Sequence, residues 1–181
     1  MTFALTYHPE TPTQIVEQIA VHHEWRSASQ LWLRYHVDIP LSELFLPDPA
    51  EPERMDDLWH TTCFELFLRE PGASPYCEFN LSPSSRWAAY GFTDFREGMH
   101  DMAVPQAPEI ALDFGDSYFA LEALLTLPDD RVLPKLAAAV SAIIVTNNGH
   151  KSFWGYRHPD GKPEFHHADC FAARLTPPVA A

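Results

Sequence analysis

Three polar side chains, those of Glu65, Glu78 and Asn80, stand between apolar residues in two segments with the alternating pattern of strands. Carboxylate and amide groups are disfavoured in the middle of strands, so their presence there calls for a reason. Carboxylates accept hydrogen bonds and an amide both donates and accepts, which suits a ligand rich in hydroxyl groups. The alternative interpretation is a partly exposed sheet face with solvated acids.

The segment 62–81 is predicted to be a β-hairpin, with a turn over Glu70–Pro75 and a further strand over Arg86–Phe92. Side chains alternate between the two faces of a strand, so the three polar groups share one face when the apolar residues face the core. Either Trp87 or Tyr90 joins them there, because a shift of register by one residue exchanges the two. Three arginines are candidate partners for the acids: Arg34, Arg86 and Arg96.

The rest of the chain predicts more short strands, because apolar residues alternate in several runs and 17 prolines stand against 7 glycines. Two segments, Pro12–Ala20 and Leu133–Val140, leave the choice between helix and strand open. The pattern as a whole predicts one all-β domain over residues 1–181, folded as an antiparallel β-sandwich. The other predicted strands lie in residues 29–39, 117–127, 139–147 and 169–177.

Charge and composition disfavour some classes of binding partner. The net charge of −13 disfavours nucleic acids and anionic membranes, which carry negative charge themselves. The sequence shows neither a secretory signal nor an apolar run as long as a membrane span, which predicts a soluble, cytoplasmic protein. Cys63, Cys77 and Cys170 have no metal-ligand spacing and are expected to be reduced thiols. The oligomeric state stays open.

Three blocks, Arg54–Leu68, Tyr76–Met99 and Ser152–Phe171, resemble the bacterial DOMON-like proteins, which are related to family-nine carbohydrate-binding modules and to haem-binding DOMON domains. The similarity runs from about Tyr7 to Leu175. It implies a β-sandwich of the jelly-roll type that binds a ligand on a concave sheet face.

The resemblance also implies roles for individual residues. In the sugar-binding modules a tryptophan precedes a strand glutamate by six residues, and Trp59 and Glu65 keep that spacing. Asn80 matches the asparagine of the second strand, and Trp154 is the candidate for a second stacking aromatic. Glu78, Trp87 and Arg96 are expected to line or support the site, or, for Arg96, to pair with Glu65 or Glu78. Glu78 departs from the family pattern, in which a basic residue is frequent.

Haem and metal ions are the alternative ligands. Haem-binding DOMON domains use axial methionine and histidine, and the stretch REGMHDM supplies Met99, His100 and Met102. A second group of histidine and acidic side chains could bind zinc or iron. Its adjacent His166 and His167 would point to opposite faces if they lie on a strand. The group consists of His158, His166 and His167 with Asp160, Glu164 and Asp169.

An enzyme that processes glycosides is a third alternative, because Glu65 and Glu78 on neighbouring strands could flank a scissile bond. No nucleophile elbow, zinc-protease motif or phosphate-binding loop occurs in the sequence. The interpretation that we carry forward is a small-ligand binding module without a cofactor, with a saccharide as the favoured ligand.

Overall fold

The computed structural model describes residues 1–129 and 135–178, and these form twelve strands and three short 3-10 helices. The helices are η1 (Leu41–Glu43), η2 (Leu58–His60) and η4 (Ala168–Cys170). The strands are β1 (Thr2–Tyr7), β2 (Gln18–Trp25), β3 (Gln30–Asp38), β4 (Cys63–Arg69), β5 (Tyr76–Leu81), β6 (Trp87–Phe92), β7 (His100–Asp101), β8 (Glu109–Gly115), β9 (Tyr118–Thr126), β10 (Leu136–Val145), β11 (Lys151–Gly155) and β12 (Ala173–Leu175).

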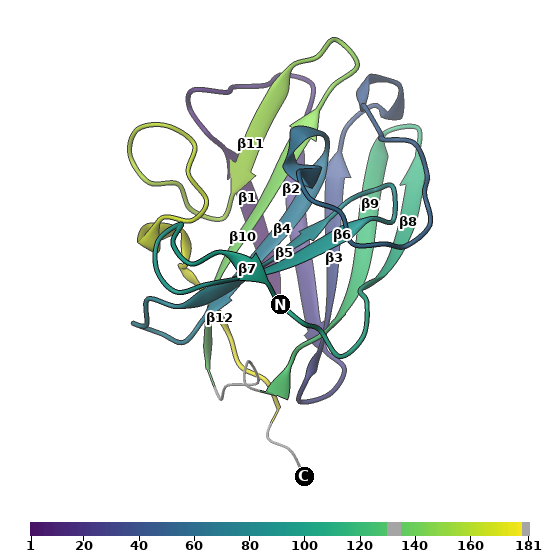
Figure 1. The fold of residues 1–181 in the computed structure, drawn as a ribbon. Helices are drawn as coiled ribbons and strands as arrows, with labels where there is room; N and C mark the ends of the chain where they lie inside the picture. Colours follow the sequence, from purple (N-terminus) through teal and green to yellow (C-terminus); the bar gives the residue numbers. More distant parts are fainter. Residues whose placement is uncertain (130–134, 179–181) are drawn as a thin grey trace.

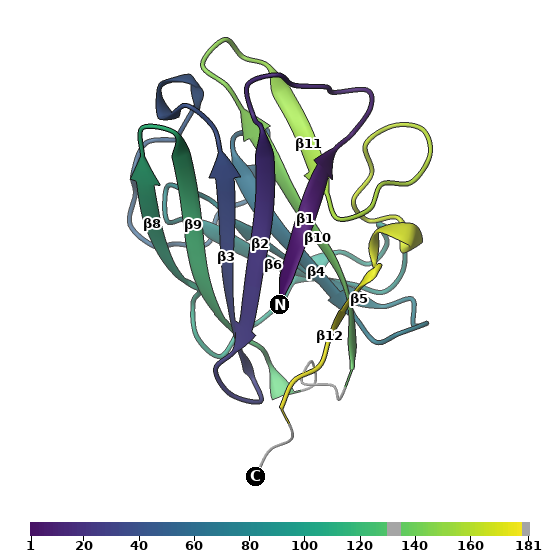
Figure 2. The same ribbon diagram turned by 180° about the vertical axis from the view of Figure 1, so that it is seen from behind.

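The strands form one antiparallel sheet that curls into two layers, in the order β7-β6-β5-β4-β10-β11-β1-β2-β3-β9-β8, with β12 added beside β10. Strand β1 belongs to both layers, because Thr2–Leu5 pairs with β2 while Thr6 and Tyr7 pair with β11. Figure 1 shows the layer of β4, β5, β6 and β10 in front, and Figure 2 shows the layer of β1, β2, β3, β9 and β8 from behind.

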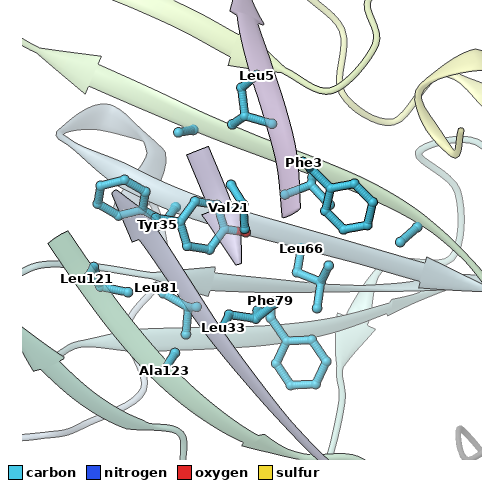
Figure 3. Close-up of a cluster of buried hydrophobic side chains, with 14 of the residues drawn as sticks. Phe3, Leu5, Val21, Leu33, Tyr35, Leu66, Phe79, Leu81, Leu121 and Ala123 are labelled. Carbon is cyan, nitrogen blue, oxygen red and sulfur yellow. The ribbon is translucent and has the colours of Figure 1, made fainter. Parts of the chain in front are cut away.

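The main core fills the space between the two layers (Figure 3). Strand β3 shows why, since every second side chain from Leu31 to Val37 is buried and the residues between them are partly exposed. Strands β4 and β5 contribute from the other side, with Leu66 and Phe79 at 0% and 1% exposure. Burying one such side chain stabilises the fold by about 1.5–3 kcal/mol, so this period-two pattern accounts for the pairing of the layers.

The front layer is buried on its outer face as well. All side chains of β5, β6 and most of β4 and β10 are buried. A second apolar cluster covers this face, built around Phe67 and Phe92 and completed by Phe165 and Phe171 from the long segment after β11, the yellow loop of Figure 1. The polar residues of β4 and β5 therefore lie beneath other parts of the chain and not on an open sheet surface.

The all-β, antiparallel, two-layered architecture predicted from the sequence is confirmed. The segment Pro12–Ala20, left open between helix and strand, has no regular structure until β2 begins at Gln18. In the second such segment, residues 136–140 lie in β10, whereas positions 133 and 134 lie outside the described residues. Nowhere in residues 1–129 and 135–178 is there a helix long and apolar enough to cross a membrane.

One polar contact ties the two layers together through the core. The hydroxyl of Tyr35, on β3, donates a hydrogen bond of 2.7 Å to the backbone carbonyl of Glu65, on β4. Tyr35 is fully buried, so this hydroxyl has no access to water. The bond holds the backbone of Glu65 at a defined height above the opposite layer.

We expect Tyr35→Phe to lower the free energy of unfolding by about 0.5–1.5 kcal/mol, because a buried hydrogen bond contributes that much. Urea denaturation measures the change. The matched control is Tyr118→Phe, whose hydroxyl donates to the exposed Asp113 at 3.1 Å, and which should change stability by less than about 0.5 kcal/mol. Equal effects of the two substitutions would contradict the structural role of the Tyr35 hydroxyl.

Candidate functional site

The polar residues of β4 and β5 share one face of the front layer. Glu65 lies directly opposite Asn80 in the antiparallel register, and Glu78 lies two residues from Asn80 on the same strand. Phe64 and Phe79 face the core between the layers. The prediction that Glu65, Glu78 and Asn80 lie on one face, opposite the apolar residues, is confirmed by this register.

A cavity of about 570 Å³ lies over this face, a volume within the usual range for small-molecule sites. Glu65, Glu78 and Asn80 form its polar floor, and aromatic side chains form much of its wall. The residues around it come from the segment before β4, from five strands and from the loops after β6 and β11. They are Asp56, Asp57, Trp59, Glu65, Glu78, Asn80, Tyr90, Phe92, Arg96, Met99, Ile143, Phe153, Pro163, Phe165 and His166.

Burial changes the acidity of the two floor carboxyls. Glu65 and Glu78 are 3% and 7% exposed. Loss of hydration raises the pKa of Glu65 to about 8, with the nearby Glu78 carboxylate acting in the same direction and the hydroxyl of Ser141, which donates to Glu65 Oε2 at 3.1 Å, acting against it. Burial also raises the pKa of Glu78 to about 7. At neutral pH the pair therefore retains protons that exposed carboxyls would have lost.

Hydrogen bonds lie on both sides of Glu78, one pair on the floor and another at the wall. The amide Nδ2 of Asn80 donates to Glu78 Oε1 at 2.8 Å. On the far side of Glu78, the Nε2 of His166 lies 3.8 Å from Glu78 Oε2. The hydroxyl of Tyr76 lies 2.8 Å from His166 Nδ1 and accepts the backbone N–H of Arg96 at 3.1 Å. We assign the hydroxyl proton to this bond with Nδ1, which makes His166 a neutral ring with its proton on Nε2.

Burial also keeps His166 uncharged. Loss of hydration, together with the nearby Arg96 guanidinium, lowers the pKa of His166 to about 4. A neutral imidazole cannot compensate the charge of Glu78 when that carboxyl ionises. The floor thus combines two acids that no cation from the described part of the chain contacts directly.

Arg96 lines the cavity but pairs with another acid. Its Nε and Nη2 each donate to the carboxylate of Glu164 at 2.9 Å, so the alternative in which it pairs with Glu65 or Glu78 is wrong for this structure. Arg96 and Asp57 both have left-handed backbones, with φ of 55° and 61°. Such residues cost energy and occur often at binding sites.

Trp59 lies at the rim of the cavity. It is 44% exposed, while the preceding Leu58 is buried and anchors helix η2 against the second apolar cluster. The ammonium of Lys151 lies 5.7 Å from the centroid of the indole ring and donates to the carbonyl of Trp59 at 3.3 Å. The ring of His60 lies beside it, with centroids 3.8 Å apart. These contacts hold an exposed indole next to the polar floor.

Trp87 and Trp154 do not reach the cavity, which corrects the expectation that they take part in the site. Both point into the core between the layers, at 7% and 2% exposure. The guanidinium of Arg54 covers the Trp87 ring at 4.7 Å, and Trp154 Nε1 donates to Ser152 Oγ at 3.0 Å. Side chains alternate between the two faces of a strand, so other residues of β6 and β11 reach the cavity instead.

Some of the cavity residues are ones that the sequence analysis missed or left open. Phe153, adjacent to Trp154 on β11, lines the cavity, as does Tyr90 on β6. Tyr90 was the alternative to Trp87, and its hydroxyl donates to Asp56 at 2.6 Å. Phe165 comes from an irregular loop, where alternation gives no signal. The one available signal for Phe153 is the strand period, which requires it to face opposite to Trp154.

The candidate metal ligands point in different directions. His158 bonds through Nε2 to the carbonyl of Thr6, and His167 lies 3.5 Å from Asp169. Only His166 of the three histidines reaches the cavity. Within the described residues, no three His, Cys, Asp or Glu side chains are grouped to hold a metal ion.

The candidate haem ligands are also separated. Met99 lines the cavity and is 58% exposed, whereas Met102 is buried in the core between the layers. The ring of His100 bonds through Nδ1 to the carbonyl of Gly98. These three side chains do not converge on one position.

No family model and no curated protein matches the sequence. Among solved structures, the chain is similar to a protein from Bacteroides uniformis ATCC 8492 described as a candidate carbohydrate-binding protein, with a TM-score of 0.64 and 14% identity over 97% of this chain and 85% of that one. It is also similar to a family 9 carbohydrate-binding module from Caldicellulosiruptor kristjanssonii in complex with glucose, with a TM-score of 0.53 and 10% identity over 91% of this chain and 78% of that one. The chain therefore has the fold of these proteins.

The floor carboxyls predict a pH dependence of stability. A carboxyl whose pKa is raised on folding lowers the stability of the folded state as pH rises between its unfolded and its folded pKa. His166, whose pKa is lowered on folding, lowers the stability as pH falls, and only below about pH 6.5. Between about pH 6.5 and 8 the carboxyls act alone. We expect the free energy of unfolding to fall over this range by on the order of 1–3 kcal/mol, since one pKa unit corresponds to about 1.4 kcal/mol.

Urea denaturation across this pH range, with Glu65→Gln beside the wild type, checks this expectation. Glu65→Gln should remove most of the decrease, because it replaces the group with the higher pKa. Glu122→Gln, on β9 in the other layer, is the control and should keep it. Parallel pH profiles for wild type and Glu65→Gln would show that this carboxyl is ionised throughout.

His166 should stay neutral well below the ordinary range of histidine. We expect the chemical shift of its ring carbon Cε1, followed by NMR, to titrate with a midpoint near pH 4. The dominant neutral tautomer should carry its proton on Nε2, because the Tyr76 hydroxyl donates to Nδ1. A midpoint at or above 6.5 would contradict the neutral state that burial and the bond with Tyr76 give His166.

Proposed function

We propose that this protein binds a saccharide in the cavity over β4 and β5. The observation that carries the proposal is the meeting of a polar floor, made by Glu65, Glu78 and Asn80, with the exposed indole of Trp59 in one cavity. A sugar offers hydroxyl groups along its edges and an apolar face of C–H groups, so it needs both kinds of surface at once.

The chemistry of the floor suits hydroxyl groups. A carboxyl that keeps its proton both donates and accepts, and one that loses it accepts twice, so Glu65 and Glu78 can bond hydroxyls in either orientation. The flat ring of Trp59 supplies a stacking surface at the rim. Phe153 and Phe165 add apolar surface to the wall.

The fold comparison supports this proposal, because the family 9 module of similar fold was solved with glucose bound. We extend the proposal to a concave binding face, to jelly-roll connectivity and to kinship with the DOMON-like proteins. A cytoplasmic location and a function without a cofactor stay predictions.

Binding should depend on Trp59. We expect isothermal titration calorimetry with a panel of neutral mono- and disaccharides to detect binding, and Trp59→Ala to weaken it about tenfold or more, equivalent to ~1.4 kcal/mol. The matched control is Trp32→Ala, since Trp32 lies on β3 of the other layer and also carries a cation over its ring, Arg26 at 5.3 Å.

Two results would contradict the proposal. Absence of binding of every saccharide tested at millimolar concentration, neutral or charged, removes its main support. An equal loss of affinity in Trp59→Ala and Trp32→Ala would place the bound sugar outside the cavity.

A further inference from the structure

The charge of the cavity is unbalanced. Four acids line it, Asp56, Asp57, Glu65 and Glu78, against a single guanidinium, that of Arg96. Both donor groups that Arg96 directs at a side chain are occupied by Glu164 at 2.9 Å. Lys151, near the rim, directs its ammonium at the carbonyl and ring of Trp59. The floor acids therefore lie in a buried place where no cation of residues 1–129 and 135–178 is bonded to them, which is unfavourable for ionised groups.

A second observation on the floor is an acceptor without a donor. Asn80 is 2% exposed and lines the cavity. Its Nδ2 is bonded to Glu78, and its Oδ1 is buried with no hydrogen-bond partner among the described residues. A buried amide oxygen without a partner is unfavourable, so such atoms commonly mark a place where a ligand or water supplies the missing donor.

The three acceptors form a compact group. Glu65 faces Asn80 across the strand pair, and Glu78 is bonded to Asn80 on the same strand. Directly opposite residues have Cβ atoms about 5 Å apart, so one small group can lie among all three. What the group lacks is a donor with positive charge.

We propose that the ligand of this cavity is a saccharide carrying a protonated primary amine, with its ammonium group among Glu65, Glu78 and Asn80 Oδ1. The inference rests on the proposed function and names the class of sugar. An ammonium group has three N–H donors, which match two carboxyls and one amide oxygen. It also supplies the missing charge, whereas a hydroxyl supplies a donor without charge.

Matched sets of sugars test the proposal. Calorimetry compares glucosamine, galactosamine and mannosamine with their parent hexoses and with their N-acetyl derivatives, which keep the nitrogen and lose the charge. We expect at least one amino sugar to bind about tenfold more tightly than its parent and its N-acetyl form, because hydrogen bonds between charged groups are about twice as strong as neutral ones.

A second readout is the number of protons released on binding. Titrations near pH 6.5 in two buffers of different ionisation enthalpy should show that the amino sugar expels a proton from the floor acids, because an ammonium stabilises their ionised form. The parent hexose should release none.

Glu78→Gln removes one charge with little change in shape, and we expect it to abolish most of the preference for the amino sugar. The control is Glu122→Gln, because Glu122 pairs with Arg34 in the other layer. This variant should retain the preference for the amino sugar. If the parent hexoses bind as tightly as the amino sugars, the inference is overturned and the proposed function stands. If neither set binds, both are overturned. Retained preference in Glu78→Gln also overturns the inference.

Discussion

The pairing of β4 with β5, with Glu65 opposite Asn80, decides which side chains reach the cavity and which fill the core. A slip by one residue would turn the acids into the apolar space between the layers and bring Phe64 and Phe79 to the cavity face. The apolar residues of both strands prevent this slip, because the core buries them almost completely. Packing on one face thus positions the chemistry on the other.

The segments that cover the front layer shield the polar face of its sheet from water. With Phe165 and Phe171 packed over it, the face loses most of its contact with water. Loss of water raises the pKa values of Glu65 and Glu78 and lowers that of His166, so opposite kinds of group all tend toward neutrality.

Three of the five tryptophans, Trp59, Trp87 and Trp154, show how one residue type takes different structural roles. Trp59 follows a buried leucine in a short 3-10 turn, and the turn directs its ring outward beside Lys151. Trp87 and Trp154 lie on strands whose other face lines the cavity, so the alternation that brings Tyr90 and Phe153 to the cavity sends both indoles into the core. Residue type alone does not distinguish these cases, because stacking aromatics and core aromatics look alike in a sequence.

The sequence by itself determined the all-β antiparallel class, the hairpin of β4 and β5 and the shared face of Glu65, Glu78 and Asn80, because these follow from local alternation and short turns. Strands β1, β7, β8 and β11 lie outside the segments that alternation predicts. Only the tertiary structure decided that this face is covered, since Phe165 and His166 reach it from nearly 90 residues away in an irregular loop. It also decided that Arg96 pairs with Glu164 and that Trp87 and Trp154 face inward. Contacts between distant segments depend on register and loop path, which no local pattern encodes.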